Sequence, residues 1–244
     1  MLELNKIYNM DCIEGMRNLP DGCIDLIVTD PPYRITSRGA CGTASGYITK
    51  DKSKKGKIFE HNDIDIKDYI DEFYRILKDN TQCYIMTNNH NIYHFLDVIE
   101  KSKFHFTKCL IWDRQNKICC QYYMNQYEFI IFMRKGKGKM INNCSCSDII
   151  SIPNNRSKNP DGSNVHDSEK PVELMKVLVT NSSLEGDVVL DPFMGSGSTA
   201  IACAISGRKF VGFELDEKYY TIAKKRIDEA NEKQRIEEAT IKLF

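Results

Sequence analysis

Short apolar runs alternate with segments of helical periodicity along this chain, and the alternation restricts the possible folds more than any single motif does. Parallel strands need a crossover connection of about a dozen residues or more, which a short helix supplies. The pattern therefore predicts an α/β fold with a doubly wound, mainly parallel sheet. The expected strands are 4–9, 23–29, 82–87, 106–112, 127–133, 188–190 and 210–213, and the expected helices are 11–19, 65–77, 90–101, 171–180, 199–206 and 217–238.

The whole-chain composition excludes several classes of protein. At 244 residues, the chain fits one domain with a buried core, and we expect 1–244 to form it. The 34 basic and 34 acidic residues give zero net charge, so a nucleic-acid partner must meet local basic patches. Neither a secretory signal pattern nor an apolar run of roughly 18 residues occurs, so we expect a cytoplasmic protein without membrane contact. The ten cysteines lack zinc-site spacing, and we expect reduced thiols and no metal.

The segment 188–214 has the pattern of a nucleoside-binding unit. An apolar strand ends at Asp191, a turn with Gly195 and Gly197 follows, and a second strand ends at Glu214. Glycines let the backbone approach a ligand closely, and an acid at about this spacing binds ribose hydroxyls in Rossmann units. The turn lacks both G-x-G-x-x-G and a P-loop lysine, which disfavours a dinucleotide or a triphosphate, whereas Asp191 suits a ligand with an ammonium group. An ordinary βαβ turn is the alternative.

A second motif follows the strand 23–29, where Asp30, Pro31, Pro32 and Tyr33 should face the same edge of the sheet. The prolines fix φ and lack an N–H, so they form a stiff edge that presents the Asp30 carboxylate and nearby carbonyls as acceptors. Two fixed acceptors can hold both N–H bonds of a base amino group and direct its lone pair at an electrophile. Tyr33 offers a face for stacking an extruded base. The alternative is a proline-terminated strand with an aromatic plug.

Together, D-P-P-Y and D-P-F-M-G-S-G-S resemble the motifs of the amino-group DNA methyltransferases. The catalytic motif comes first, which is similar to the permuted β-class, and the matches cover most of the chain. The resemblance implies a Rossmann-like S-adenosylmethionine-dependent methyltransferase fold, circularly permuted, with a seven-stranded sheet whose last strand is antiparallel. It also implies that 4–9 and 23–29 are the third and fourth strands of that fold, and that 188–191 and 210–214 are the first and second.

The resemblance further implies residue roles. Asp11 resembles the acid that meets the cofactor adenine, and Glu214 the carboxylate that takes its ribose. The segment H-D-S-E-K-P resembles the H-x-x-[EQ]-K-P motif beside the methionine moiety, with Asp167 where proline is usual. The implied catalytic residues are Asp30, Pro31, Pro32 and Tyr33, and the implied cofactor residues are Asp11, Cys12, Asp30, His166, Lys170, Asp191, Pro192, Phe193, Gly195, Ser196, Gly197, Ser198, Glu214 and Leu215.

Two segments are candidates for contact with double-stranded DNA. The first, 34–60, has the composition of a mobile loop, and the second, 114–165, is where this class usually places target recognition. Lysines near phosphates add affinity that is blind to sequence. Tyr122, Tyr123 and Tyr127 could stack on bases, but we expect them to pack in the core. The candidate DNA-binding residues are Arg34, Arg38, Lys50, Lys52, Lys54, Lys55, Arg114 and Lys117, each of which could instead be a solvated side chain.

The leading hypothesis is a DNA methyltransferase that acts on N6 of adenine by direct displacement after base flipping. In the family that the chain resembles, aspartate at the first motif position favours adenine, whereas serine is common for cytosine N4. A cytosine-N4 enzyme, an RNA methyltransferase and a catalytically silent nucleic-acid-binding partner are the alternatives. A homodimer is a further hypothesis, because the recognition region is small. The C-terminal sequence 240–244 faintly resembles sliding-clamp peptides that end in Leu-Phe.

Overall fold

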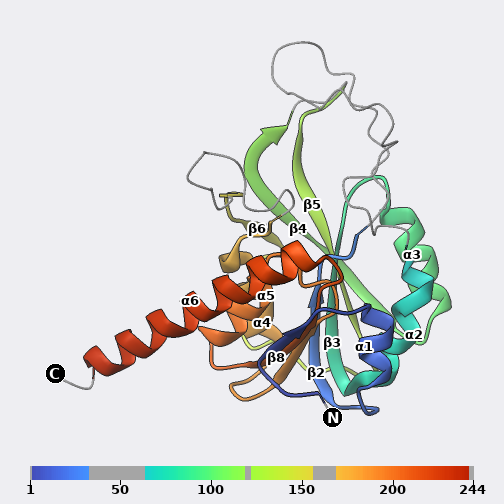
Figure 1. The fold of residues 1–244 in the computed structure, drawn as a ribbon. Helices are drawn as coiled ribbons and strands as arrows, with labels where there is room; N and C mark the ends of the chain where they lie inside the picture. Colours follow the sequence, from blue (N-terminus) through green and yellow to red (C-terminus); the bar gives the residue numbers. More distant parts are fainter. Residues whose placement is uncertain (1, 33–63, 119–121, 156–168, 242–244) are drawn as a thin grey trace.

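The computed structural model describes residues 2–32, 64–118, 122–155 and 169–241. These residues form an eight-stranded sheet flanked by helices (Figure 1). The strands are β1 (Lys6–Tyr8), β2 (Ile24–Thr29), β3 (Leu77–Thr87), β4 (His105–Ile118), β5 (Asn125–Arg134), β6 (Ile149–Ser151), β7 (Val188–Asp191) and β8 (Lys209–Phe213). The helices are α1 (Cys12–Arg17), α2 (Ile66–Ile76), α3 (Ile92–Lys101), α4 (Val172–Ser182), α5 (Ser198–Ala204) and α6 (Glu217–Ile241).

The sheet confirms the doubly wound, mainly parallel topology. Its spatial order is β1-β8-β7-β2-β3-β5-β4-β6, and β5 is antiparallel to both of its neighbours. The two strands from the end of the chain, β7 and β8, lie between β1 and β2 and pair in parallel with them. The order β1-β8-β7-β2 therefore reads third, second, first and fourth in the numbering of the resembled fold, as the permuted order predicts.

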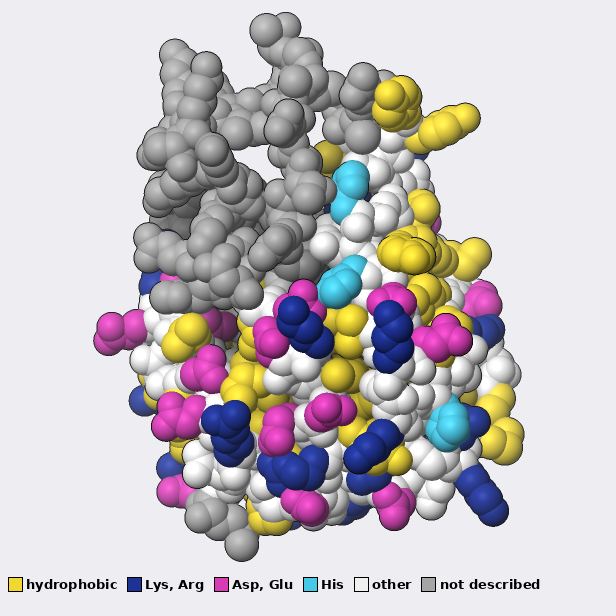
Figure 2. All heavy atoms as spheres, turned by 90° about the vertical axis from the view of Figure 1, so that its right-hand side faces the viewer, with side chains coloured by type: hydrophobic (Ala, Val, Ile, Leu, Met, Phe, Trp, Pro, Cys, Tyr) yellow, Lys and Arg dark blue, Asp and Glu magenta, His cyan; other side chains and the backbone are white. Residues whose placement is uncertain are grey.

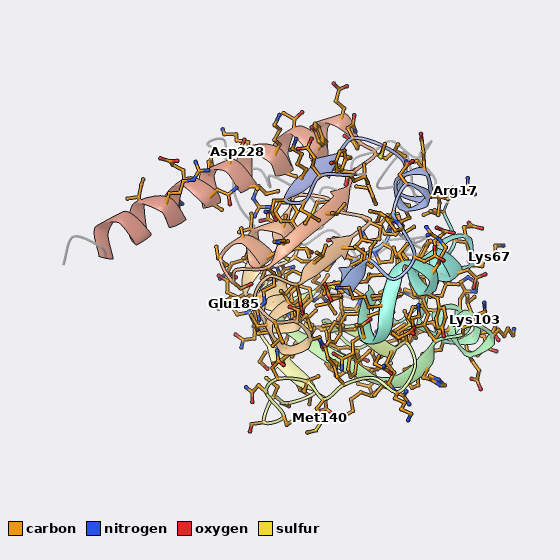
Figure 3. The ribbon with its side chains drawn as sticks, turned by 90° about the horizontal axis from the view of Figure 1, so that it is seen from below. Arg17, Lys67, Lys103, Met140, Glu185 and Asp228 are labelled. Atoms are coloured by element: carbon orange, nitrogen blue, oxygen red, sulfur yellow. The ribbon has the colours of Figure 1, made fainter. Side chains whose placement is uncertain are left out.

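Helices cover both faces of the sheet. In Figure 1, α1, α2 and α3 lie on one side, and α4, α5 and α6 lie on the other. Figure 3 shows the same division from below, with Arg17 and Lys67 on one side and Glu185 on the opposite side. The helix ends follow their sequence signals, since α2 begins with a capping box formed by Asp65 and Asp68. Because helices cover both faces of the sheet, the ends of the strands are the part of the sheet that the helices leave uncovered.

Alternate strand residues feed two separate hydrophobic cores. In β2, Ile27 joins the core beneath α1, α2 and α3, whereas Leu26 and Val28 join the core beneath α4 and α5. In β3, Cys83 and Tyr84 divide between the two cores in the same way. Side chains of successive strand residues point to opposite faces, so a continuous apolar run is what a sheet covered on both faces requires.

Three details differ from the sequence expectations. The described sheet has eight strands instead of seven, because β6 forms where no strand was expected and pairs with β4. β3 starts at Leu77, directly after α2, not at residue 82. β4 and β5 are longer than expected, and beyond the Thr87–Phe129 pair β5 pairs only with β4. The β4–β5 pair thus extends past the carboxyl end of β3 (Figure 1).

Some expectations concern other parts of the chain. The loop 34–60 falls wholly outside the described residues, as do residues 242–244 of the clamp-like segment. Among the helices that the structure describes, none is long and apolar enough to cross a membrane.

Candidate active site

Three carboxylates lie where neighbouring strands end. Asp191 is the last residue of β7, Asp30 directly follows β2, and Glu214 directly follows β8. These three strands are adjacent and parallel, so their carboxyl ends meet at one edge of the sheet. Ligands of doubly wound sheets bind at this edge. The structure thus brings the two sequence motifs together.

Asp191 links the two motifs through hydrogen bonds. Its carboxylate accepts bonds from the hydroxyls of Thr29 at 2.7 Å and Thr199 at 2.6 Å, and from the N–H of Phe193 at 3.1 Å. Thr29 is the last residue of β2 and Thr199 lies in the first turn of α5. Burial raises the pKa of Asp191 to about 6, against the lowering effect of these bonds. Asp191 therefore fixes the catalytic strand relative to the glycine turn.

The glycine turn depends on a backbone conformation that other residues rarely adopt. Gly197, the residue before α5, has φ of +86°. A Cβ at Gly197 would approach the side chain of Ala223 in α6 to 3.2 Å. The turn therefore needs glycine here both for its backbone angle and for contact with α6.

Glu214 closes the other side of the turn. Its carboxylate accepts the N–H of Gly195 at 2.7 Å and the N–H of Asp216 at 2.9 Å. Asn9, which follows β1, donates to the main-chain oxygens of Glu214 and Leu215. Burial raises the pKa of Glu214 to about 7, although the two N–H donors lower it. A carboxylate with this pKa titrates in the neutral range.

Asp30 lies in a buried cluster of charges. The ammonium group of Lys170 contacts Asp30 Oδ2 and lies 3.5 Å from Glu128 Oε2. Glu128 Oε1 in turn contacts the guanidinium of Arg114 at 3.2 Å. The Asp30 side chain is 17% exposed and that of Lys170 is 8% exposed. Burial raises the pKa of Asp30, Lys170 lowers it, and the negative charge of Glu128 raises it.

The remaining predicted site residues lie partly in the core, partly beside the glycine turn, and partly outside the described residues. Asp11 caps α1 by accepting the N–H groups of Ile13 and Glu14, and Cys12 packs in the core with its pKa raised to about 12 by burial. Pro31 is buried, and Phe193 packs edge-on against Tyr69. Further predicted residues lie in or beside the glycine turn or after β8, namely Pro192, Ser196, Ser198 and Leu215. Tyr33 and His166 lie outside the described residues.

Two expectations about the DNA-binding region are wrong. Arg114 is only 6% exposed and donates to Glu128 and to main-chain oxygens of β5, so its guanidinium is not presented to a phosphate. Tyr122 and Tyr123 are 84% and 92% exposed instead of packed in the core. Both errors arise from the long β4–β5 pair, in which β4 is buried at Trp112 and Arg114 and the far end of the pair is exposed. Lys117 is exposed, and the other candidates, Arg34, Arg38, Lys50, Lys52, Lys54 and Lys55, lie outside the described residues.

The sequence analysis missed three residues that complete the site. Thr29 and Thr199 hold Asp191, and Glu128 contacts Lys170. The hydroxyls had a signal, because each threonine adjoins a predicted motif at a strand or helix end. Glu128 had none, because it stands near the start of an apolar run and its partners are distant in the sequence.

The site has the donors and acceptors that a nucleoside with a charged tail needs. Two buried side-chain oxygens, Ser198 Oγ and Asp30 Oδ1, have no hydrogen-bond partner among the described residues. Such groups are costly unless a ligand or water satisfies them. The carboxylate of Glu214 and the glycine turn at Gly197 fit S-adenosylmethionine in their chemistry. No three described His, Cys, Asp or Glu side chains are grouped to hold a metal ion.

The family model of DNA methylases matches residues 24–225. The chain belongs to this family, and it is an S-adenosylmethionine-dependent DNA methyltransferase. It is 28% identical to the Type II methyltransferase M.HinfI of Haemophilus influenzae, over 93% of this chain and 69% of the relative. It is 27% identical to the Type II methyltransferase M2.DpnII of Streptococcus pneumoniae, over 93% of this chain and 90% of that relative.

Solved structures share the fold. The complex of M1.HpyAVI with S-adenosylmethionine has a TM-score of 0.65 at 24% identity, covering 91% of this chain and 98% of that one. The PvuII DNA methyltransferase, described as cytosine-N4-specific, has a TM-score of 0.68 at 14% identity, covering 93% and 91%. These similarities confirm the Rossmann-like methyltransferase architecture that the strand order defines.

Proposed function

We propose that this enzyme transfers a methyl group to N6 of adenine in double-stranded DNA. The observation that carries the proposal is the buried Asp30 carboxylate, whose Oδ1 has no hydrogen-bond partner among the described residues. An exocyclic amino group is a donor that matches such an acceptor. Aspartate at this motif position favours adenine in the family that the sequence resembles.

Asp30 is the proposed catalytic residue. Its carboxylate accepts an N–H of the target amino group, and the stiff Asp-Pro-Pro segment offers main-chain carbonyls with no competing N–H from either proline. Acceptors fixed in this way stabilise the positive charge that develops on the nitrogen. A base inside a duplex is out of reach, so the target nucleotide must leave the stack.

The cofactor is proposed to bind across the glycine turn. When bound, S-adenosylmethionine supplies an electrophilic methyl group on a sulfonium. Glu214 is proposed to accept the ribose hydroxyls, and the buried Ser198 hydroxyl, which has no partner among the described residues, is proposed to donate to the polar tail. Asp191 supports this region by holding Thr29 and Thr199, because its carboxylate oxygens already accept three hydrogen bonds within the chain.

The β4–β5 pair is proposed to contact DNA as part of a recognition region over 114–165. It extends past the carboxyl end of β3, beside the strand ends that carry Asp30 and Asp191. Figure 2 shows apolar side chains exposed at the height to which this pair rises in Figure 1. The exposed large apolar residues at the far end of the pair include Ile118, Tyr122, Tyr123 and Met124, and aromatic faces stack on unpaired bases. The loop 34–60 is proposed as a second DNA contact.

Two further points extend the proposal. We propose a cytoplasmic location, because every cysteine among the described residues is a free thiol. We also propose a homodimer, because one small recognition region covers little of a duplex. Sedimentation equilibrium of the active enzyme tests the proposed homodimer. A particle with the mass of one chain and full activity would refute it.

One experiment tests the reaction. The enzyme is incubated with labelled S-adenosylmethionine and unmethylated DNA, RNA or protein, and the digested product is identified by mass spectrometry. We expect N6-methyladenine in DNA. N4-methylcytosine, or label confined to RNA or protein, would overturn the proposed target. Asp30→Ala should abolish transfer while the affinity for the cofactor, measured by calorimetry, stays close to that of the wild type.

A further inference from the structure

The Asp30 carboxylate is one end of a buried charge chain that runs Asp30, Lys170, Glu128 and Arg114. Two acids and two bases give the chain a formal charge of zero. All four side chains are mostly buried, and they come from the end of β2, the residue pair before α4, and strands β5 and β4. Buried charges persist only when they are paired, so each member depends on its neighbours.

Glu128 is held rigidly on one side and is open on the other. Arg114 contacts Glu128 Oε1 at 3.2 Å and donates to the main-chain oxygen of Asn125 at 3.0 Å, which fixes the guanidinium on β5. Glu128 Oε2 is buried and has no hydrogen-bond partner among the described residues, although the ammonium of Lys170 lies only 3.5 Å away. Glu128 therefore offers Lys170 a ready second acceptor.

The same ammonium pairs with the carboxylate that catalysis needs, at the oxygen next to the free Oδ1. Lys170 contacts Asp30 Oδ2, and a cation on a carboxylate weakens it as an acceptor for a second donor. An incoming amino group gains full use of Asp30 only when Lys170 takes another partner. Among the described carboxylates in contact with Lys170, Glu128 is the alternative to Asp30.

We propose that Glu128 is a positioning residue for methyl transfer, which receives the Lys170 ammonium when the target amino group occupies Asp30. This inference rests on the proposed function, because it assigns the amino group to Asp30. No bond is made or broken in the exchange, and no proton moves. The exchange also couples the β4–β5 pair, which carries Glu128 and Arg114, to the catalytic carboxylate.

The arrangement has a signature in the pH dependence of catalysis. Among the described residues, the ionisable groups that interact with Asp30 are Lys170, Glu128, Asp191 and Tyr69. Lys170 favours the ionised carboxylate, and Glu128 disfavours it. Removal of either charge should therefore move the acid limb of kcat/KM for DNA, which reports the free enzyme, and the two removals should move it in opposite directions.

The test compares Glu128→Gln and Lys170→Met with the wild type. For Glu128→Gln we expect the acid limb to move down by about one pH unit, and for Lys170→Met to move up by about one unit or more. The plateau kcat of Glu128→Gln should fall by about ten- to a hundredfold, because Lys170 stays on Asp30. The KM for S-adenosylmethionine should change little. Asp97→Asn, which breaks the exposed Lys101–Asp97 pair within α3, is the matched control and should match the wild type.

Shifts of the two limbs in the same direction, or no shift, would overturn the proposal, because damage to packing alone has no reason to give opposite signs. Thermal unfolding and cofactor calorimetry establish that each variant is folded. Should Glu128→Gln fail to fold, Glu128→Asp keeps the charge but shortens the reach, and a plateau kcat equal to the wild type would refute the role. The base identified in the product is a separate result. N4-methylcytosine would overturn the adenine target alone, since both amino groups need the same acceptors.

Discussion

Cofactor binding should depend on the ionisation of Glu214. Only the carboxylate accepts hydrogen bonds at both oxygens, and burial raises the pKa of Glu214 to about 7. For a group with that pKa, the ionised fraction rises from about 0.1 at pH 6 to about 0.9 at pH 8. The dissociation constant of S-adenosylmethionine should therefore fall about tenfold over this range, which corresponds to about 1.4 kcal/mol.

Isothermal titration calorimetry at fixed ionic strength between pH 5.5 and 8.5 measures this change. Buffers with different ionisation enthalpies also give the proton count, and binding near pH 6 should release close to one proton. The amino group of the cofactor titrates at about 7.7–8.0, so its contribution must be separated. Glu214→Gln removes the carboxylate, and its binding should be weaker and should retain only the cofactor's own pH dependence. Equal slopes in the variant and the wild type, with no extra proton released, would refute the reasoning.

Three stability predictions concern the same region, each measured by urea unfolding. Asp191→Ala leaves two buried hydroxyls and one N–H without their acceptor, so unfolding free energy should fall by about 2–4 kcal/mol. The loss should be larger at pH 5 than at pH 8. The pKa of Asp191 in the folded protein is about 6, above its ordinary value, so the stability that this carboxyl contributes to the wild type is lost as pH rises from about 4 to 6. An equal loss at both pH values would contradict this sign. Gly197→Ala should cost about 1–3 kcal/mol, because its φ of +86° is strained for alanine and its Cβ would approach Ala223. Gly15→Ala should also destabilise by about 1–3 kcal/mol, since its Cβ would lie 2.4 Å from the Phe213 ring. Wild-type stability in either glycine variant would contradict these predictions, because it would show that the backbone adjusts freely.

The sequence was sufficient for the parts of the fold that depend on local pattern. Apolar runs located β2, β7 and β8, because strands buried on both faces read as continuous apolar segments. Aspartate or glutamate after each of these runs located the candidate site, because parallel strands bring their carboxyl ends to one edge. The family resemblance then supplied the strand order, which apolar patterning alone leaves open.

The parts that were missed depend on contacts between distant segments. The three-residue strand β6 exists only because β4 offers an edge, so its own sequence carries little signal. From its residue type, Arg114 is expected at the surface. It is buried because Glu128, on the neighbouring strand, pairs with its guanidinium. Tyr122 and Tyr123 are large aromatic residues of a kind often found in a core. They are exposed to solvent because the β4–β5 pair extends beyond the rest of the sheet.

The position of β7 and β8 between β1 and β2 has a consequence for synthesis of the chain. Thr29 and its partner Asp191 are 162 residues apart, and a ribosome at about 5–20 residues per second needs roughly 8–32 seconds to cover that distance. During this interval β2 has no partner on its β7 side, and β1 lacks β8. An unpaired parallel edge of this kind invites wrong pairing. The newly made enzyme is therefore most exposed to aggregation before its last quarter emerges, because two interior strands of its sheet, β7 and β8, are the last to be made.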